Sequence, residues 1–240
     1  MIVKKIINWL LSKKIVSSHK RAIETIVAQF IYFAGNGVIV WYNDPIRSKV
    51  LDLVKQIKKE TEMLLEDIEG YNIWMAVKRT EKINGDIAEV GVYKGGSAKI
   101  ICEAKKGNKQ LYLFDTFEGL PDVEKIDISF TKGQLVASID DVKNYLKKYS
   151  NIHFYKGFFP KTGEPIKNRK FSFVHLDVDI YSSTLSGLNF FYPRLNRGGV
   201  IISHDYIQAA GVRKAFDDFF KDKPEPIIEL PRTQCLIVKI

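Results

Sequence analysis

Two aspartates near the ends of predicted strands could together hold a cation. Asp177 lies near the end of the predicted strand Phe171–Val178, and Asp205 follows the predicted strand Val200–Ser203. If both strands belong to one parallel sheet, their carboxyl ends meet at one edge and bring the two carboxylates together. Isolated buried carboxylates are very costly, so carboxylates that converge usually hold a cation or a proton. Oxygen ligands at an open site favour Mg2+ or Mn2+.

A glycine-rich turn and a later aspartate indicate a site for an adenosine ligand. Residues 91–96 hold three glycines, which let the backbone turn tightly beside a ligand, and Ser97 can cap the helix that follows. The glycine spacing does not fit the dinucleotide fingerprint GxGxxG. Asp115 ends the next predicted strand and can accept hydrogen bonds from both ribose hydroxyls, which disfavours a phosphorylated ribose.

The ligand that fits these features is S-adenosylmethionine or NAD. The pair Asp177 and Asp205 favours S-adenosylmethionine, because NAD dehydrogenases rarely need a carboxylate cluster, whereas methyl transfer to a hydroxyl does.

The elements that must position these residues form a regular series. Ser48 can cap a helix that Gly70 ends, and a second helix is expected over Tyr71–Lys82. Near-continuous apolar runs separated by helices predict a parallel sheet with helices on both faces. The connection Pro231–Thr233 is so short that the last two strands must form an antiparallel hairpin. The predicted strands are Ile87–Val92, Gln110–Asp115, Ile152–Tyr155, Phe171–Val178, Val200–Ser203, Pro226–Leu230 and Cys235–Ile240; the helices between and after them are Gly96–Lys106, Ser138–Tyr149, Ser182–Leu195 and Gly211–Phe220, with a polar loop over 160–169.

The composition is that of one soluble domain with a large core: 240 residues, 45% hydrophobic and 27% charged. Two cysteines are too few for a disulfide framework and fit a reducing, cytoplasmic compartment. The net charge of +9 is concentrated in residues 1–60, which hold 11 of the 37 basic residues but only 4 of the 28 acidic ones. The rest of the chain has little attraction for polyanions, so no nucleic-acid partner is expected.

Residues 1–45 are expected to be a basic, amphipathic helical arm, and residues 46–240 the ligand-binding domain. In residues 1–18, pairs of aliphatic residues alternate with pairs of lysines at helical spacing. Lys13 and Lys14 interrupt the apolar core that a signal peptide needs. Two interpretations stay open: the arm packs on the body or on a second subunit, in keeping with a homodimer, or it contacts a membrane surface peripherally.

Several motifs resemble the TylF (macrocin O-methyltransferase) family of class I methyltransferases. They are residues 85–97, Phe114–Pro121, Leu176–Thr184, Tyr192–Leu195, Gly198–Ile202 and His204–Tyr206. The resemblance covers roughly residues 70–240 in order, and residues 1–45 match no family that we can name. It implies a Rossmann-like class I methyltransferase fold, a mostly parallel seven-stranded sheet with a C-terminal hairpin. The activity it implies is O-methylation of sugar hydroxyls on glycosylated metabolites, dependent on S-adenosylmethionine and a divalent metal.

The resemblance also implies which residues contact the cofactor. Glu89, Gly91 and Ser97 would surround the methionine end, and Asp115 would hold the ribose. The adjoining Thr116 and Phe117 would also contact the cofactor. The turn holding Gly157 and Phe158 would face the adenine.

On the metal side, the resemblance implies that Asp177 and Asp205 are ligands. The family commonly has a further acid beside the second of these, and His204 stands there instead. Three roles for His204 therefore stay open. It could be a metal ligand, which would shift the preference of the site from Mg2+ toward Mn2+, or it could be a base or a hydrogen-bond donor. We favour Asp179 as the base over His204; the alternative for Asp179 is a cap on the following helix. The long connection Glu118–Val136 is expected to be a lid over cofactor and acceptor.

Three functions follow. The first is a metal-dependent O-methyltransferase acting on a small sugar-containing acceptor. The second is a related enzyme for a non-sugar hydroxyl, such as a catechol or a lipid-linked acceptor. The third is a non-catalytic membrane-associated binding protein on the same fold, which would predict degraded cofactor motifs; these motifs look intact.

Overall fold

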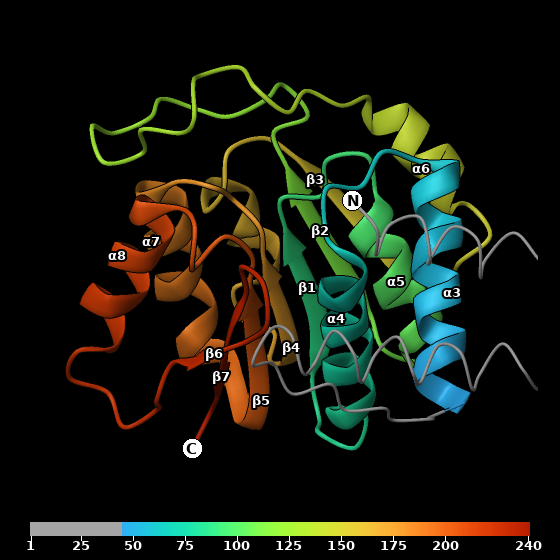
Figure 1. The fold of residues 1–240 in the computed structure, drawn as a ribbon. Coiled ribbons are helices and arrows are strands. Elements are labelled where there is room, and N and C mark those ends of the chain that lie inside the picture. The colour runs from blue at the N-terminus through green and yellow to red at the C-terminus, as the bar shows by residue number, and fades with distance from the viewer. Residues whose placement is uncertain (1–44) are drawn as a thin grey trace, which may run out of the picture. The chain divides into compact units, whose positions relative to one another are not determined.

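The computed structural model describes residues 45–240, which form a seven-stranded sheet with helices on both faces (Figure 1). The strand order is β3-β2-β1-β4-β5-β7-β6. Strands β1 to β5 are parallel, and β7 runs antiparallel to both β5 and β6. The strands are β1 Asp86–Val90, β2 Leu111–Asp115, β3 Ile152–Lys156, β4 Phe171–Leu176, β5 Leu195–Ser203, β6 Ile228–Glu229 and β7 Cys235–Val238. The predicted fold class, including the C-terminal hairpin, is confirmed.

Two hydrophobic cores cover the two faces of the sheet. One core joins the sheet to α3 (Pro45–Glu60), α4 (Asp67–Arg79), α5 (Gly96–Ala104) and α6 (Ile139–Leu146). The other joins it to α7 (Tyr181–Phe191), α8 (Ala210–Phe220) and the short 3-10 helix η1 (Lys161–Ile166). Successive residues of β1 and β2 alternate between the two cores, so both faces are buried and the strands are apolar almost throughout. Figure 1 shows the helices of the two cores on opposite sides of the sheet.

The strand order reverses between β1 and β4, and the residues that follow the carboxyl ends of these two strands approach each other closely. Gly91, directly after β1, has a φ of +87°. A Cβ at this position would overlap the main-chain carbonyl of Asp177, directly after β4. Only glycine therefore allows the main chain at position 91 to lie so close to Asp177. The loops after β1 and β4 meet in this way at the carboxyl ends of the strands, where ligands bind in sheets of this kind.

The first predicted helix is wrong at both ends, and α3 begins at Pro45, so Ser48 lies inside the helix instead of capping it. The chain leaves the helix after Glu60 and starts α4 at Asp67, so residues 61–66 form a connection rather than helix. Gly70 does not stop a helix but lies inside α4. The residue is a glycine because a Cβ there would come within 2.9 Å of both methyl carbons of Val54. The glycine serves the packing of α4 on α3. The connection matters for the site, because residues 62–65 line the cavity described below.

Other boundaries shift in ways that affect the site less, with one exception. The predicted strand Pro226–Leu230 shortens to β6, the predicted loop over 160–169 contains η1, and the predicted helix Ser182–Leu195 divides into α7 and the 3-10 helix η2 (Tyr192–Arg194). The exception is the predicted strand Phe171–Val178, which ends at Leu176. Asp177 and Asp179 therefore lie on a loop instead of on one face of a strand.

Residues 1–44 lie outside the described residues, and so does the predicted amphipathic arm with its membrane or subunit contact. The boundary between arm and domain and the homodimer also stay predictions. Within residues 45–240, no helix has both the length and the hydropathy to cross a bilayer.

Candidate active site

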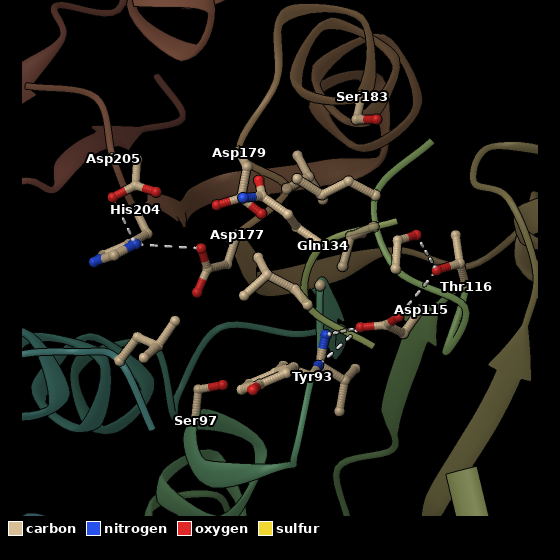
Figure 2. A pocket seen from close by; sticks show the side chains of 18 of the residues that line it. Tyr93, Ser97, Asp115, Thr116, Gln134, Asp177, Asp179, Ser183, His204 and Asp205 are labelled. Carbon is tan, nitrogen blue, oxygen red and sulfur yellow. Dashed lines mark hydrogen bonds and ion pairs between the residues drawn. The ribbon is translucent and has the colours of Figure 1, made fainter. Parts of the chain in front are cut away.

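A cavity of about 510 Å3 opens at the carboxyl ends of the parallel strands (Figure 2). Its walls come from the loops after β1, β2, β3, β4 and β5 and from the connection before α4. Its volume lies within the roughly 300–1,000 Å3 that small-molecule sites usually have. The cavity therefore stands where sheets of this topology bind ligands.

At one end of the cavity, Asp115 joins the loops that follow β1 and β2. Its Oδ2 accepts the backbone N–H groups of Val92 at 2.7 Å and Tyr93 at 2.8 Å. Its Oδ1 accepts the N–H of Phe117 at 2.7 Å. The hydroxyl of Thr116 also lies 3.5 Å from Oδ1, but its single hydrogen has a shorter bond available to the Gly119 carbonyl at 2.7 Å. A carboxylate offers about four acceptor positions, and the three backbone bonds occupy most of them. The sequence suggested bonds to both ribose hydroxyls; with these backbone bonds in place, room remains for about one direct bond.

The predicted cofactor residues divide into those that line the cavity and those that do not. Figure 2 shows Ser97, Asp115 and Thr116 along its wall. The residues of the prediction that line it are Gly91, Ser97, Asp115, Thr116, Gly157 and Phe158. Phe117 is buried in the core against α5 and α6 instead. Ser97 does not cap α5, because Gly95, at a φ of +80°, is the residue that precedes the first turn.

Glu89, the other predicted cofactor residue, is wholly buried beneath the cavity. Its Oε1 lies 2.8 Å from Nδ1 of His175 on the neighbouring strand β4, and neither side chain is exposed. Burial raises the pKa of Glu89 above its usual value, against the opposing effect of His175. Glu89 therefore does not line the cavity, and its contact with the cofactor stays a prediction.

At the other end of the cavity, Asp177, His204 and Asp205 gather around one point (Figure 2). Nδ1 of His204 lies 2.9 Å from Oδ1 of Asp205 and 3.3 Å from Oδ1 of Asp177. One ligand atom from each residue lies within 4.8 Å of the others, a spacing that can surround a single ion. The amide of Gln208 also donates to Asp205. The structure thus brings the three predicted ligands together.

The charges around His204 fit a bound cation. Burial opposes ionisation of Asp177, but His204 outweighs it and lowers the pKa of that carboxyl. Burial also opposes ionisation of His204, which by itself would lower its pKa. The attraction of Asp177 and the bonds to Asp205 and Glu69 instead raise the pKa of His204 well above its usual range. These residues thus hold more negative charge than one imidazolium balances, and a divalent ion that displaced the Nδ1 proton would compensate that charge and free Nδ1 as a ligand.

A turn in the main chain places the side chain of Asp179 beside the same acidic residues. Its φ is +64° and its side chain is buried, lying beside Asp177 and Asp205 at the same end of the cavity (Figure 2). Burial and these two carboxylates raise the pKa of Asp179 well above its usual value. Asp179 is not the cap of α7, which was the alternative: no side chain caps that helix at Ile180, and the N–H of Tyr181 donates to Asp127 at 3.0 Å.

Glu69 on α4 belongs to this group as well, and the sequence analysis did not identify it. Its Oε2 lies 3.4 Å from Nε2 of His204, and its Oε1 accepts from the hydroxyl of Thr233 at 2.6 Å. Burial opposes its ionisation, but the bonds from His204, Thr233 and the Glu66 N–H lower its pKa to about 2. The signal was present: Glu69 stands at helical spacing from Ile73 and Ala76, on the apolar face of α4. Starting that helix at Tyr71 removed Glu69 from the pattern.

The connection from β2 to α6 lies across the top of the sheet in Figure 1 and forms one wall of the cavity. Its two ends are tied together by bonds from Leu120 N–H to the Gln134 carbonyl at 2.7 Å and from Gly133 N–H to the Leu120 carbonyl at 2.9 Å. Asp127, in its middle, is buried against the start of α7, where it accepts the Tyr181 N–H. Its action as a lid remains a prediction.

The sequence profile of the macrocin O-methyltransferase (TylF) family matches residues 71–234. Over 140 residues, 52% of this chain and 54% of the relative, the chain is 26% identical to the 8-demethyl-8-(2,3-dimethoxy-alpha-L-rhamnosyl)-tetracenomycin-C 4'-O-methyltransferase of Streptomyces olivaceus. Over 171 residues, 65% of this chain and 62% of the relative, it is 24% identical to the demethyldecarbamoylnovobiocin O-methyltransferase of Streptomyces niveus. The match thus spans less than two thirds of either relative.

The fold is also that of solved structures. The O-methyltransferase NovP superposes with a TM-score of 0.70 at 21% identity, over 80% of this chain and 99% of NovP. The family match covers most of residues 45–240 and includes every predicted site residue, which confirms the resemblance seen in the motifs. The chain therefore belongs to the TylF macrocin O-methyltransferase family.

Proposed function

We propose that this chain is an O-methyltransferase that uses S-adenosylmethionine and a divalent metal to methylate a sugar hydroxyl of a glycosylated metabolite or glycan. The observation that carries the proposal is one cavity with Asp115 at one end and Asp177, His204 and Asp205 at the other. Family membership supports the reaction class. The names of the two Streptomyces relatives describe O-methylation, in one case of a compound that carries a rhamnosyl group.

The residues at the Asp115 end would hold the cofactor. S-adenosylmethionine, when bound, supplies a methyl group that its positive sulfur already activates. Asp115 would bind the ribose through its remaining acceptor position, Ser97 would face the methionine end, and Phe158 would contact the adenine. The chain must then align a weak nucleophile, a neutral alcohol, with that methyl group.

The residues at the acidic end would prepare the acceptor. Asp177, Asp205 and His204 would hold the divalent ion, which, when bound, lowers the pKa of the acceptor hydroxyl. Asp179 would take the hydroxyl proton, a contribution of about 10²–10⁴-fold. Both nitrogens of His204 face carboxylates, which supports a role for His204 as ligand over a role as base.

A methyl-transfer assay tests the proposal. The full chain is incubated with labelled S-adenosylmethionine and a panel of glycosides, catechols and lipid-linked acceptors. We expect label to enter a glycoside, EDTA to abolish transfer, and added Mg2+ or Mn2+ to restore it. Transfer that is indifferent to EDTA would contradict the metal role. Transfer only to a catechol or a lipid-linked acceptor would contradict the sugar, and calorimetry that detects no binding of S-adenosylmethionine would leave a non-catalytic protein.

Replacing Asp115 by Ala should weaken the binding of S-adenosylmethionine. One hydrogen bond to a charged group contributes about 1.5–3 kcal/mol, so the dissociation constant should rise about 10- to 100-fold. Calorimetry on the folded variant measures the change. The variant also loses three bonds from backbone N–H groups, so a control must separate ligand binding from folding.

Asp86→Ala is the matched control for Asp115→Ala. Asp86 also accepts a backbone N–H, that of Gln110 at 3.3 Å. It begins β1, at the amino ends of the parallel strands and away from the cavity, which it does not line. We expect this control to lower stability without changing the dissociation constant of S-adenosylmethionine. An unchanged dissociation constant in Asp115→Ala itself would refute the ribose assignment.

A further inference from the structure

His204 stands between carboxylates on both edges of its ring. Nδ1 faces Asp205 at 2.9 Å and Asp177 at 3.3 Å, while Nε2 faces Glu69 at 3.4 Å. A neutral imidazole has one N–H group and one lone pair, so it can donate to only one of these two sides. The side that Glu69 occupies therefore decides what the other nitrogen presents to Asp177 and Asp205.

Glu69 is held rigidly in place. Its Oε1 accepts the N–H of Thr233 at 3.0 Å and the hydroxyl of Thr233 at 2.6 Å, and its Oε2 accepts the N–H of Glu66 at 2.7 Å. The side chain is 1% exposed. A second buried bond, from Asn72 to Gln234 at 3.0 Å, links the same helix to the same C-terminal segment. Glu69 is thus an oriented hydrogen-bond acceptor before any ligand arrives.

An acceptor at Nε2 requires that Nε2 carry the hydrogen. In the neutral ring the lone pair of Nδ1 then points at the oxygens of Asp177 and Asp205, an arrangement that is repulsive unless Nδ1 binds either a proton or a metal cation. Histidine ligands of metals almost always donate their other N–H to a carboxylate, a carbonyl or a water in this way. The geometry on the far side of the ring thus complements the proposed ion site on the near side.

We propose that Glu69 is a positioning residue that fixes Nδ1 of His204 as a metal ligand and thereby makes the site prefer Mn2+ or a similar imidazole-binding ion over Mg2+. The inference rests on the proposed function, because it presumes the divalent ion. Imidazole suits transition metals, whereas Mg2+ favours oxygen ligands and retains several waters. The pair of His204 and Glu69 thus gives a reason for a histidine where the family commonly has an acid.

The test measures metal binding without turnover. Calorimetry gives the dissociation constants of Mn2+ and Mg2+ for the full-length protein and for E69Q, H204D and the double variant. If the E69Q amide directs its oxygen to Thr233, it turns its NH2 group to Nε2 and removes the acceptor that His204 needs. Loss of such a supporting residue typically costs 10–100-fold in metal affinity, so the Mn2+ to Mg2+ affinity ratio should fall about tenfold or more.

The double variant distinguishes positioning from simple charge. Removing a negative charge near the site weakens both ions alike, which leaves their affinity ratio unchanged. In H204D there is no ring to position, so we expect E69Q to change the ratio in the wild-type chain but not in the H204D background. Pulsed electron paramagnetic resonance of bound Mn2+ should show a directly coordinated nitrogen in the wild type, and that signal should be absent in H204D.

Asn72→Ala is the structural control, since it breaks the neighbouring link between α4 and the C-terminal segment, where Gln234 bonds to the Glu69 carbonyl, without removing any partner of the Glu69 side chain. We expect it to leave the affinity ratio unchanged. An equal loss for both ions in E69Q, the same ratio shift in Asn72→Ala, or no nitrogen signal in the wild type would overturn this inference alone. No binding of either ion to the wild type would instead overturn the metal role in the proposed function.

Discussion

An Asp177→Asn variant is expected to lose about 10³-fold or more of its turnover, since the ion it would help to hold contributes several kcal/mol to the reaction. Asp177 is one of the two carboxylates that face Nδ1 of His204, and it lies at the end of the cavity away from Asp115 (Figure 2). The amide keeps the shape of the side chain but removes its charge. The dissociation constant of S-adenosylmethionine should therefore stay within about threefold of the wild-type value.

Steady-state kinetics with labelled S-adenosylmethionine and calorimetry with Mn2+ measure the two effects in Asp177→Asn. The metal should bind much more weakly, and excess metal should recover part of the turnover. Asp140→Asn is the matched control, because that aspartate is exposed on α6 and does not line the cavity. Turnover in Asp177→Asn that equals the control would contradict the metal role of this end of the cavity.

The sheet could be predicted from the sequence because its strands are buried on both faces. Burial on both sides makes a strand largely apolar, as in Leu111–Phe114 and, apart from Ser172 and His175, in Phe171–Leu176, and such runs stand out between helices. The hairpin followed from the shortness of its connection. Sheet topology alone then predicted that Asp177 and Asp205 meet at one end of the strands, and the family resemblance added His204 as a candidate beside them.

The connection before α4 could not be predicted in the same way. Leu64 and Leu65 continue the helical spacing of α3, so the apolar pattern passes through residues 61–66 although the helix does not. What begins the new helix is local: the side chain of Glu69 accepts the N–H of Glu66. The same glutamate also contacts His204, which lies far away in the sequence. A periodic pattern of apolar residues gives no indication of such a distant contact. The two roles of Glu69 became visible only together with the structure.

The two ends of the cavity are joined by the chain itself. Gly91 lies against the carbonyl of Asp177, and the N–H groups of Val92 and Tyr93, directly after it, donate to Asp115. The turn after β1 thus contacts both the predicted ribose site and the predicted metal site. Because its glycine permits the approach, cofactor and acceptor would meet over this turn, which is the geometry that a direct transfer between them needs.

An Asp179→Asn variant is expected to lose about 10²–10⁴-fold of its turnover, the usual contribution of a general base. Asp179 lies beside Asp177 and Asp205 but is not among the three residues whose ligand atoms surround one point. The affinity for S-adenosylmethionine should therefore change little, and the affinity for Mn2+ should fall much less than in Asp177→Asn, because only a nearby charge and no ligand is lost. This combination separates a base from a ligand, because Asp177→Asn should lose turnover and metal affinity together.

Asp127→Asn is the matched control for Asp179→Asn, since Asp127 accepts the N–H of Tyr181 and so contacts the same turn from outside the reacting groups. Its amide retains one oxygen that can accept the Tyr181 N–H, although the bond from the Glu124 N–H to the other oxygen is lost, so stability should fall somewhat while most of the turnover remains. If Asp179→Asn kept turnover similar to this control, the proton would have to leave through His204. That outcome would also conflict with the ring geometry, because a base at Nδ1 needs a free lone pair that the metal would already occupy. The two variants together therefore test whether Asp179 takes the proton while His204 holds the ion.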